Sequence, residues 1–199
     1  MSNSSINWAN FATIARVILA FITYALLLSK PQTNSYCYIG FVLTILVIAG
    51  DYLDGQLARA LKQSSVFGGW LDIAADRVVE ICYWIVFAHL HWISPWIAII
   101  FVVRGILVDG IRSFAAEKGF TAFGDKTMMN SNIGKFLVSS RFSRVSYAVL
   151  KAMAFSLVIL SQCHSNLSLI AQICVYGATV FCLIRGIPVL IESARFIKD

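Results

Sequence analysis

Apolar runs, each close to the roughly 20 residues that a helix needs to cross a bilayer, alternate along this chain with polar connections. The runs are Phe11–Ser29, Tyr36–Leu61, Phe67–His89, Trp96–Ala116, Arg144–Leu160 and Leu167–Ile191. A short segment that contains Trp8 precedes the first run, and tryptophan favours the membrane–water interface. The pattern therefore predicts an all-α integral membrane protein. It would form one domain over residues 1–199, with six transmembrane helices and a short N-terminal interfacial segment.

Basic residues are distributed unevenly between the two sets of connections. The connections after the second and fourth runs and the C-terminal tail contain Arg59, Lys62, Lys118, Lys126, Lys135, Arg141, Arg144, Arg195 and Lys198. The opposite connections contain Lys30 alone. By the positive-inside rule the first set faces the cytoplasm. We therefore expect a multi-pass protein of the cell (inner) membrane, with both termini inside. The long polar connection 117–143 and the tail from Glu192 onward would be cytoplasmic.

Composition narrows the function classes. Hydrophobic residues make up 59% of the chain and charged residues 13%, which excludes an ordinary soluble domain and a disordered chain. The formal net charge is +6, but the basic residues are dispersed among apolar runs, so anionic lipid and phosphorylated substrates are expected partners and nucleic acid is not. The five cysteines stand singly, without a C-x-x-C pair or a histidine cluster. We interpret them as small apolar packing residues.

Four aspartates lie inside or at the ends of the second and third runs. Because an acidic side chain at mid-bilayer depth costs about 2.5 to 3.5 kcal/mol, a bound divalent cation is the simplest compensation. Helical periodicity places Asp51, Asp54, Gly55 and Ala58 on one stripe and Gly68, Asp72 and Asp76 on another. Two such stripes would form an all-oxygen cage suited to Mg²⁺ or Mn²⁺, and Arg59 would offer a positive charge to a phosphate. The alternative is that the aspartates are helix caps and loop charges.

The aspartate spacing resembles a known family. The pattern D-x2-D-G-x2-A-R-x8-G-x3-D-x3-D, which runs from Asp51 to Asp76, is similar to the signature of the CDP-alcohol phosphotransferases. The resemblance implies that Asp51, Asp54, Asp72 and Asp76 bind two divalent ions and that Asp76 deprotonates the acceptor hydroxyl. It also implies that Asp51, Gly55, Ala58, Arg59 and Gly68 line the CDP site. The phosphatidyl group of CDP-diacylglycerol would be transferred and CMP released, usually by a homodimer.

Three further segments resemble the phosphatidylglycerophosphate synthases within that family. Asn10, Thr13 and Arg16 match an N-x2-T-x2-R opening, with Ala9 where a proline is usual, and would add Asn10 and Thr13 to the CDP site. RGILVDGIRSFAAEKG resembles the fourth helix, with Gly105 where glutamate is usual. SSRFSRVSYAVLKA partly matches a basic region. The resemblance implies glycerol 3-phosphate, or another phosphorylated alcohol, as the acceptor. Its phosphate would be bound by Arg112, Lys135, Arg141 and Arg144.

Several alternatives stay open at the level of sequence. The acceptor cations have a second explanation in positive-inside sorting, and Arg16 and Arg185 have one in snorkelling to the interface. Glu80 either supports the aspartate site or pairs with an arginine. A phosphatidylinositol-phosphate synthase would use the same motif. A prenyltransferase would lack the D-G-x2-A-R core, and a divalent-cation transporter would need a path of carboxylates toward the outer face, for which Glu80 and Asp109 are candidates.

Overall fold

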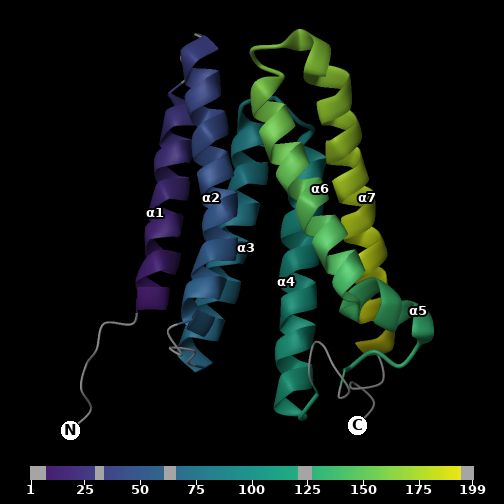
Figure 1. Ribbon diagram of the computed structural model, residues 1–199. Coiled ribbons are helices and arrows are strands. Elements are labelled where there is room, and N and C mark those ends of the chain that lie inside the picture. Colours follow the sequence, from purple (N-terminus) through teal and green to yellow (C-terminus); the bar gives the residue numbers. More distant parts are fainter. Residues whose placement is uncertain (1–7, 30–33, 61–65, 121–126, 194–199) are drawn as a thin grey trace, which may run out of the picture. The chain divides into compact units, whose positions relative to one another are not determined.

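The structure, a computed structural model, describes residues 8–29, 34–60, 66–120 and 127–193, without the side chains of Ala9, residues 52–60 and Val66. These residues are almost entirely helical (Figure 1). The long helices are α1 (Trp8–Leu28), α2 (Asn34–Ala60), α3 (Val66–His89), α4 (Pro95–Glu117), α6 (Arg141–Leu160) and α7 (Ser168–Ser193). The short ones are α5 (Asn132–Gly134), the π-helix η1 (Lys135–Ser139) and the 3₁₀-helix η2 (Ser165–Leu167).

Each apolar run predicted from the sequence coincides with one long helix, so the all-α prediction is confirmed. Within the described ranges, four segments are long and apolar enough to cross a membrane: Asn10–Leu28, Asn34–Asp51, Arg141–Leu160 and Ser165–Ser193. Helices α3 and α4 are not among these segments, because they carry more charged residues between their apolar ones. The chain is therefore a multi-pass membrane protein by its helices, while six spans stay a prediction. The predicted interfacial segment before Trp8 lies outside the described residues.

The chain divides into two compact units, which are described separately. Unit 1 comprises Met1–Ile93 and Phe155–Ser168, and unit 2 comprises Ser94–Ala154 and Leu169–Asp199. In unit 1, α1 packs along both α2 and α3 (Figure 1). Polar residues on these three helices are therefore able to meet in one place.

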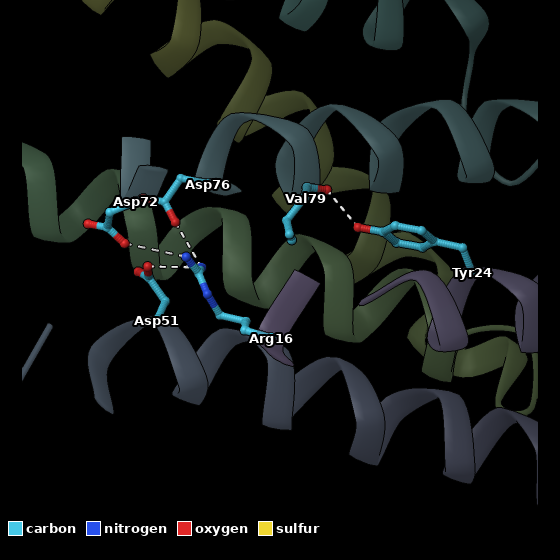
Figure 2. A network of polar contacts seen from close by, with 6 residues as sticks. All are labelled: Arg16, Tyr24, Asp51, Asp72, Asp76 and Val79. Atoms are coloured by element: carbon cyan, nitrogen blue, oxygen red, sulfur yellow. Dashed lines mark hydrogen bonds and ion pairs between the residues drawn. The ribbon is translucent and has the colours of Figure 1, made fainter. Parts of the chain in front are cut away.

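An aromatic core fixes α1, α2 and α3 within unit 1. The Tyr83 ring stacks on Phe155 with centroids 4.8 Å apart and meets Tyr24 edge-on at 4.9 Å. The Tyr24 hydroxyl donates to the Val79 carbonyl at 2.9 Å (Figure 2), and the Tyr83 hydroxyl donates to Thr44 Oγ1 at 3.0 Å. Buried hydroxyls of this kind specify one register, because a shifted helix would leave each of them unsatisfied.

The cysteines only partly follow the expectation from sequence. Cys37, near the start of α2, is paired with Cys163, which follows α6, and their Cα atoms lie 6.3 Å apart. This pairing corrects the prediction that all five cysteines act singly. Cys174 and Cys182 are free and buried in α7, as small packing residues are, and Cys82 is free and half-buried.

Unit 2 contains a core that was not predicted from the sequence. The connection predicted as polar over 117–143 buries Met128, Met129 and Val138 in a cluster with Val108 of α4 and Val189 of α7. A helical segment made of α5 and η1 follows the two methionines. The part of this connection that the structure describes is thus a packed element and not a polar loop.

Glu192 holds this segment to the end of α7. One of its carboxylate oxygens accepts from the Asn130 backbone N–H at 2.5 Å and from that of Ser131 at 3.4 Å. The other accepts from the Ser131 hydroxyl at 2.5 Å, and Ser131 Oγ in turn accepts from the Gly134 N–H at 2.9 Å. Glu192 is 6% exposed. The prediction that the chain becomes a polar tail at Glu192 is therefore wrong for Glu192 and Ser193, which are buried residues of α7.

Arg185 is the second polar contact inside unit 2. Its guanidinium donates to the Ser143 carbonyl at 2.9 Å and the Val138 carbonyl at 3.3 Å, and it lies 5.2 Å from the Tyr147 ring centroid. The residue is 5% exposed, so it does not snorkel. It joins α7 to the junction of η1 and α6, the segment that carries Lys135, Arg141 and Arg144.

The cap of α5, formed by Ser131 and the Glu192 carboxylate that binds it, leaves no room for a side chain at Gly134. A Cβ built at Gly134 would lie 2.5 Å from a carboxylate oxygen of Glu192 and 2.8 Å from Ser131 Oγ. We expect Gly134→Ala to lower the free energy of unfolding by about 2 kcal/mol, since the cap must open. Gly177→Ala is the matched control, because its Cβ would meet only Leu150, at 3.7 Å or more. Titration with sodium dodecyl sulfate, followed by circular dichroism, compares the two. Equal midpoints would contradict the prediction.

Candidate metal and nucleotide site

Three carboxylates meet near the end of unit 1 where α2 ends and α3 begins. Asp51 lies on α2, and Asp72 and Asp76 lie one turn apart on the same face of α3. Each offers an oxygen, and these three oxygens lie within 4.8 Å of one another. The structure therefore brings together three of the four predicted aspartates, although their role as ligands stays a prediction.

Arg16 reaches the same point from α1. Its Nη1 lies 2.9 Å from Asp51 Oδ1 and 2.8 Å from Asp76 Oδ1, and its Nη2 lies 3.5 Å from Asp72 Oδ1 (Figure 2). Gly50 provides the space, since a Cβ there would lie 3.3 Å from Arg16 Cδ. The Arg16 side chain is 5% exposed, whereas the three carboxylates are each close to half exposed. Arg16 is thus paired inside the protein, which excludes the snorkelling alternative.

The cluster has the donor set of a site for a hard divalent cation. All three groups are carboxylates, and oxygen ligands are what Mg²⁺ and Mn²⁺ prefer. Their oxygens are close enough to share an ion, and a cationic guanidinium already lies among them. The residues present therefore fit a divalent ion.

Other residues that are predicted to bind the nucleotide lie within one or two helical turns of Arg16 or of these aspartates. Thr13 is buried on α1 one turn before Arg16, Asn10 is one turn earlier, and Gly68 is one turn before Asp72 on α3. Helix α2 continues to Ala60, so its periodicity carries the stripe onward from Asp51. Four predicted side chains lie outside the described residues, namely Asp54, Gly55, Ala58 and Arg59.

Comparison with known proteins decides the family. The model of the CDP-alcohol phosphatidyltransferase family matches residues 6–184 of this chain. The chain belongs to the CDP-alcohol phosphatidyltransferase family. The matched region contains the whole aspartate pattern, so the resemblance inferred from that pattern is confirmed.

Curated relatives carry one enzyme name. The CDP-diacylglycerol–glycerol-3-phosphate 3-phosphatidyltransferase of Pseudomonas fluorescens is 35% identical over 123 residues, which are 60% of this chain and 62% of that protein. The enzyme of the same name from Haemophilus influenzae is 34% identical over 113 residues, 55% of this chain and 59% of that protein. That from Cereibacter sphaeroides is 29% identical over 121 residues, 56% of this chain and 52% of that protein. The chain thus spans between about half and about three-fifths of the length of these relatives.

The four basic residues that are predicted to bind the phosphate of the acceptor all belong to unit 2. Arg112 is half-buried on α4, Lys135 is exposed at the start of η1, and Arg141 and Arg144 are exposed in the first turn of α6. The contacts of Glu192 and Arg185 hold the segments that carry the last three. Convergence of the four cations on one phosphate stays a prediction.

Sequence reasoning left three polar residues undecided or unused, and the structure gives each a partner. Glu80 pairs with Arg77 at 3.2 Å, so it follows the arginine-pairing alternative. Arg185 binds backbone carbonyls, and Glu192 binds backbone N–H groups that lie 61 and 62 residues earlier in the chain. The signal for the last two was the presence of two charged residues, Arg185 and Glu192, in the otherwise apolar α7, and that pattern identifies no partner for either of them.

Proposed function

We propose that this chain transfers the phosphatidyl group of CDP-diacylglycerol to glycerol 3-phosphate, giving phosphatidylglycerol phosphate and CMP. The observation that carries the proposal is the meeting of Asp51, Asp72 and Asp76, spaced in sequence as in the family pattern, within 4.8 Å. The choice of acceptor is supported by the name that the relatives share. The site would act within one domain over residues 1–199.

The aspartates would hold two divalent ions, Mg²⁺ or Mn²⁺. When bound, such ions would neutralise the charge of the pyrophosphate and stabilise both the attacking and the departing oxygen. Asp51, Asp54 and Asp72 would serve as ligands, together with Asp76. Asn10, Thr13, Gly55, Ala58, Arg59 and Gly68 would orient the CDP portion, with the small residues giving the nucleotide room beside the helices.

Asp76 would also accept the proton of the acceptor hydroxyl. The freed oxygen forms a bond to the phosphorus that carries diacylglycerol, and the phosphoanhydride bond to CMP breaks. The side chain of Asp76 is 47% exposed although it pairs with Arg16, and this exposure suits a general base that must meet a substrate. Arg112, Lys135, Arg141 and Arg144 would bind the acceptor phosphate, because guanidinium groups match a phosphate in charge and geometry and the lysine ammonium adds a positive charge.

The membrane arrangement follows from the same proposal. Six spans with both termini in the cytoplasm would open the aspartate site toward the compartment that contains nucleotides. The diacylglycerol chains would remain in the bilayer. A homodimer in the cell (inner) membrane is the assembly we expect.

The acceptor can be tested directly. We expect purified protein with CDP-diacylglycerol and Mg²⁺ to release CMP when glycerol 3-phosphate is added, and to release little with inositol, inositol phosphate or serine. Chromatographic detection of CMP and of the lipid product makes the comparison. Release that requires inositol phosphate would replace the acceptor and keep the aspartate site. No release with any of the four would contradict the proposed function.

A further inference from the structure

The position of Arg16 among the aspartates has a consequence for how an ion enters. Arg16 Nη1 bridges two carboxylates, at 2.9 Å from Asp51 Oδ1 and 2.8 Å from Asp76 Oδ1 (Figure 2). A small divalent cation binds its oxygens at about 2.0–2.1 Å, and an ion shared by these two oxygens would lie between them. Nη1 takes that place in the structure. The guanidinium and such an ion therefore exclude each other.

Burial shows from which side the guanidinium arrives. The Arg16 side chain is 5% exposed, whereas Asp51 is 48% and Asp76 is 47% exposed. Arg16 comes along α1, passing Gly50 of α2, where any side chain would press on its Cδ and Cγ. The carboxylates keep an open side toward their surroundings, by which a soluble ion can approach. The protein interior thus supplies the Arg16 guanidinium to the carboxylates, while their exposed side is accessible to an ion.

We propose that Arg16 is the internal counter-ion of the aspartate site: it occupies the site of the metal-free protein and withdraws from Asp51 and Asp76 when a divalent ion binds. Three carboxylates this close repel one another strongly unless a cation lies among them. Arg16 supplies that cation, and its withdrawal is a cost that every binding ion must meet. The proposal rests on the proposed function only in treating these aspartates as ligands of a divalent ion.

The proposal predicts the sign of one measurable effect. If the ion must displace Arg16, removing the guanidinium removes that cost and the ion binds more tightly. If Arg16 instead stayed in place to orient the ligands, its removal would weaken binding. The two roles therefore predict opposite changes in the dissociation constant.

The test is Mn²⁺ binding to the detergent-purified full-length chain without substrates, measured from the free-ion signal in electron paramagnetic resonance. We expect Arg16→Gln to lower the dissociation constant by about tenfold, as loss of a competing charge in direct contact does. Arg77→Gln is the matched control. It removes a cation from α3, on which α1 packs, and the Arg77 guanidinium contacts Glu80 at 3.2 Å. It should leave the constant within about twofold. An unchanged or raised constant in Arg16→Gln overturns the proposal.

A second measurement uses the unaltered chain and so does not depend on the folding of a variant. We expect Mn²⁺ to raise the rate at which phenylglyoxal modifies Arg16 by several-fold, read by mass spectrometry of the peptide, because the guanidinium leaves its carboxylate partners. A rate that Mn²⁺ leaves unchanged or lowers overturns the proposal. If the protein releases no CMP with any acceptor, yet both measurements behave as expected, the proposed function fails and this inference stands.

Discussion

Replacing Asp76 by asparagine is expected to lower the turnover number for CMP release by about a thousandfold, within the range that general base catalysis supplies. Asparagine keeps the size of the side chain, but its amide does not accept the proton of an attacking hydroxyl. The substitution also removes one negative charge from the cluster of Asp51, Asp72 and Asp76, whose oxygens lie within 4.8 Å. Steady-state CMP release at saturating CDP-diacylglycerol and glycerol 3-phosphate measures the loss.

Two comparisons separate the base from the ligand role. The loss in Asp76→Asn should persist when Mn²⁺ is raised until it saturates the variant, because more ion does not restore a proton acceptor. Glu80→Gln removes a carboxylate one turn further along α3 that pairs with Arg77, and it should keep turnover within a few-fold of normal. An Asp76→Asn protein that turns over normally with its metal bound would show that another group takes the proton.

The aspartate cluster could be predicted from the sequence because its information is local. Asp72 and Asp76 are one helical turn apart, and charge inside an apolar run is costly enough to demand an explanation. Asp51 was expected near them because the connection between the second and third apolar runs is short, which places both halves of the pattern near the same membrane face. The partner of Arg16 was not predictable in the same way, since Asp76 is 60 residues distant and only the packing of α1 on α2 and α3 brings the two together.

The helices themselves followed from the apolar runs, while the structure of the connection before α6 did not. Its polar composition predicted a loop, yet Met128, Met129 and Val138 within it are buried against α4 and α7. Nothing in the spacing of these residues distinguishes a packed segment from a loop. Their order depends on contacts from α7, and Glu192 supplies the polar part of those contacts.

The second large effect is expected at Glu192, far along the chain from the aspartates. Glu192→Ala should lower the free energy of unfolding by about 3 kcal/mol, because it removes hydrogen bonds to a charged group and leaves their donors unsatisfied. The substitution leaves the backbone N–H groups of Asn130 and Ser131 and the Ser131 hydroxyl without the carboxylate that accepts from them. Unfolding in sodium dodecyl sulfate, followed by circular dichroism, measures the change.

The same substitution should also affect the acceptor, because α5 leads directly into η1, which begins at Lys135. When the cap is lost, Lys135 is held less firmly, so we expect the KM for glycerol 3-phosphate to rise about tenfold while kcat falls less. Glu117→Ala is the matched control, since Glu117 is an exposed glutamate at the end of α4 in the same unit. It should change stability by no more than about 0.5 kcal/mol. If Glu192→Ala matches that control in both stability and KM, Glu192 does not order the segment that carries Lys135.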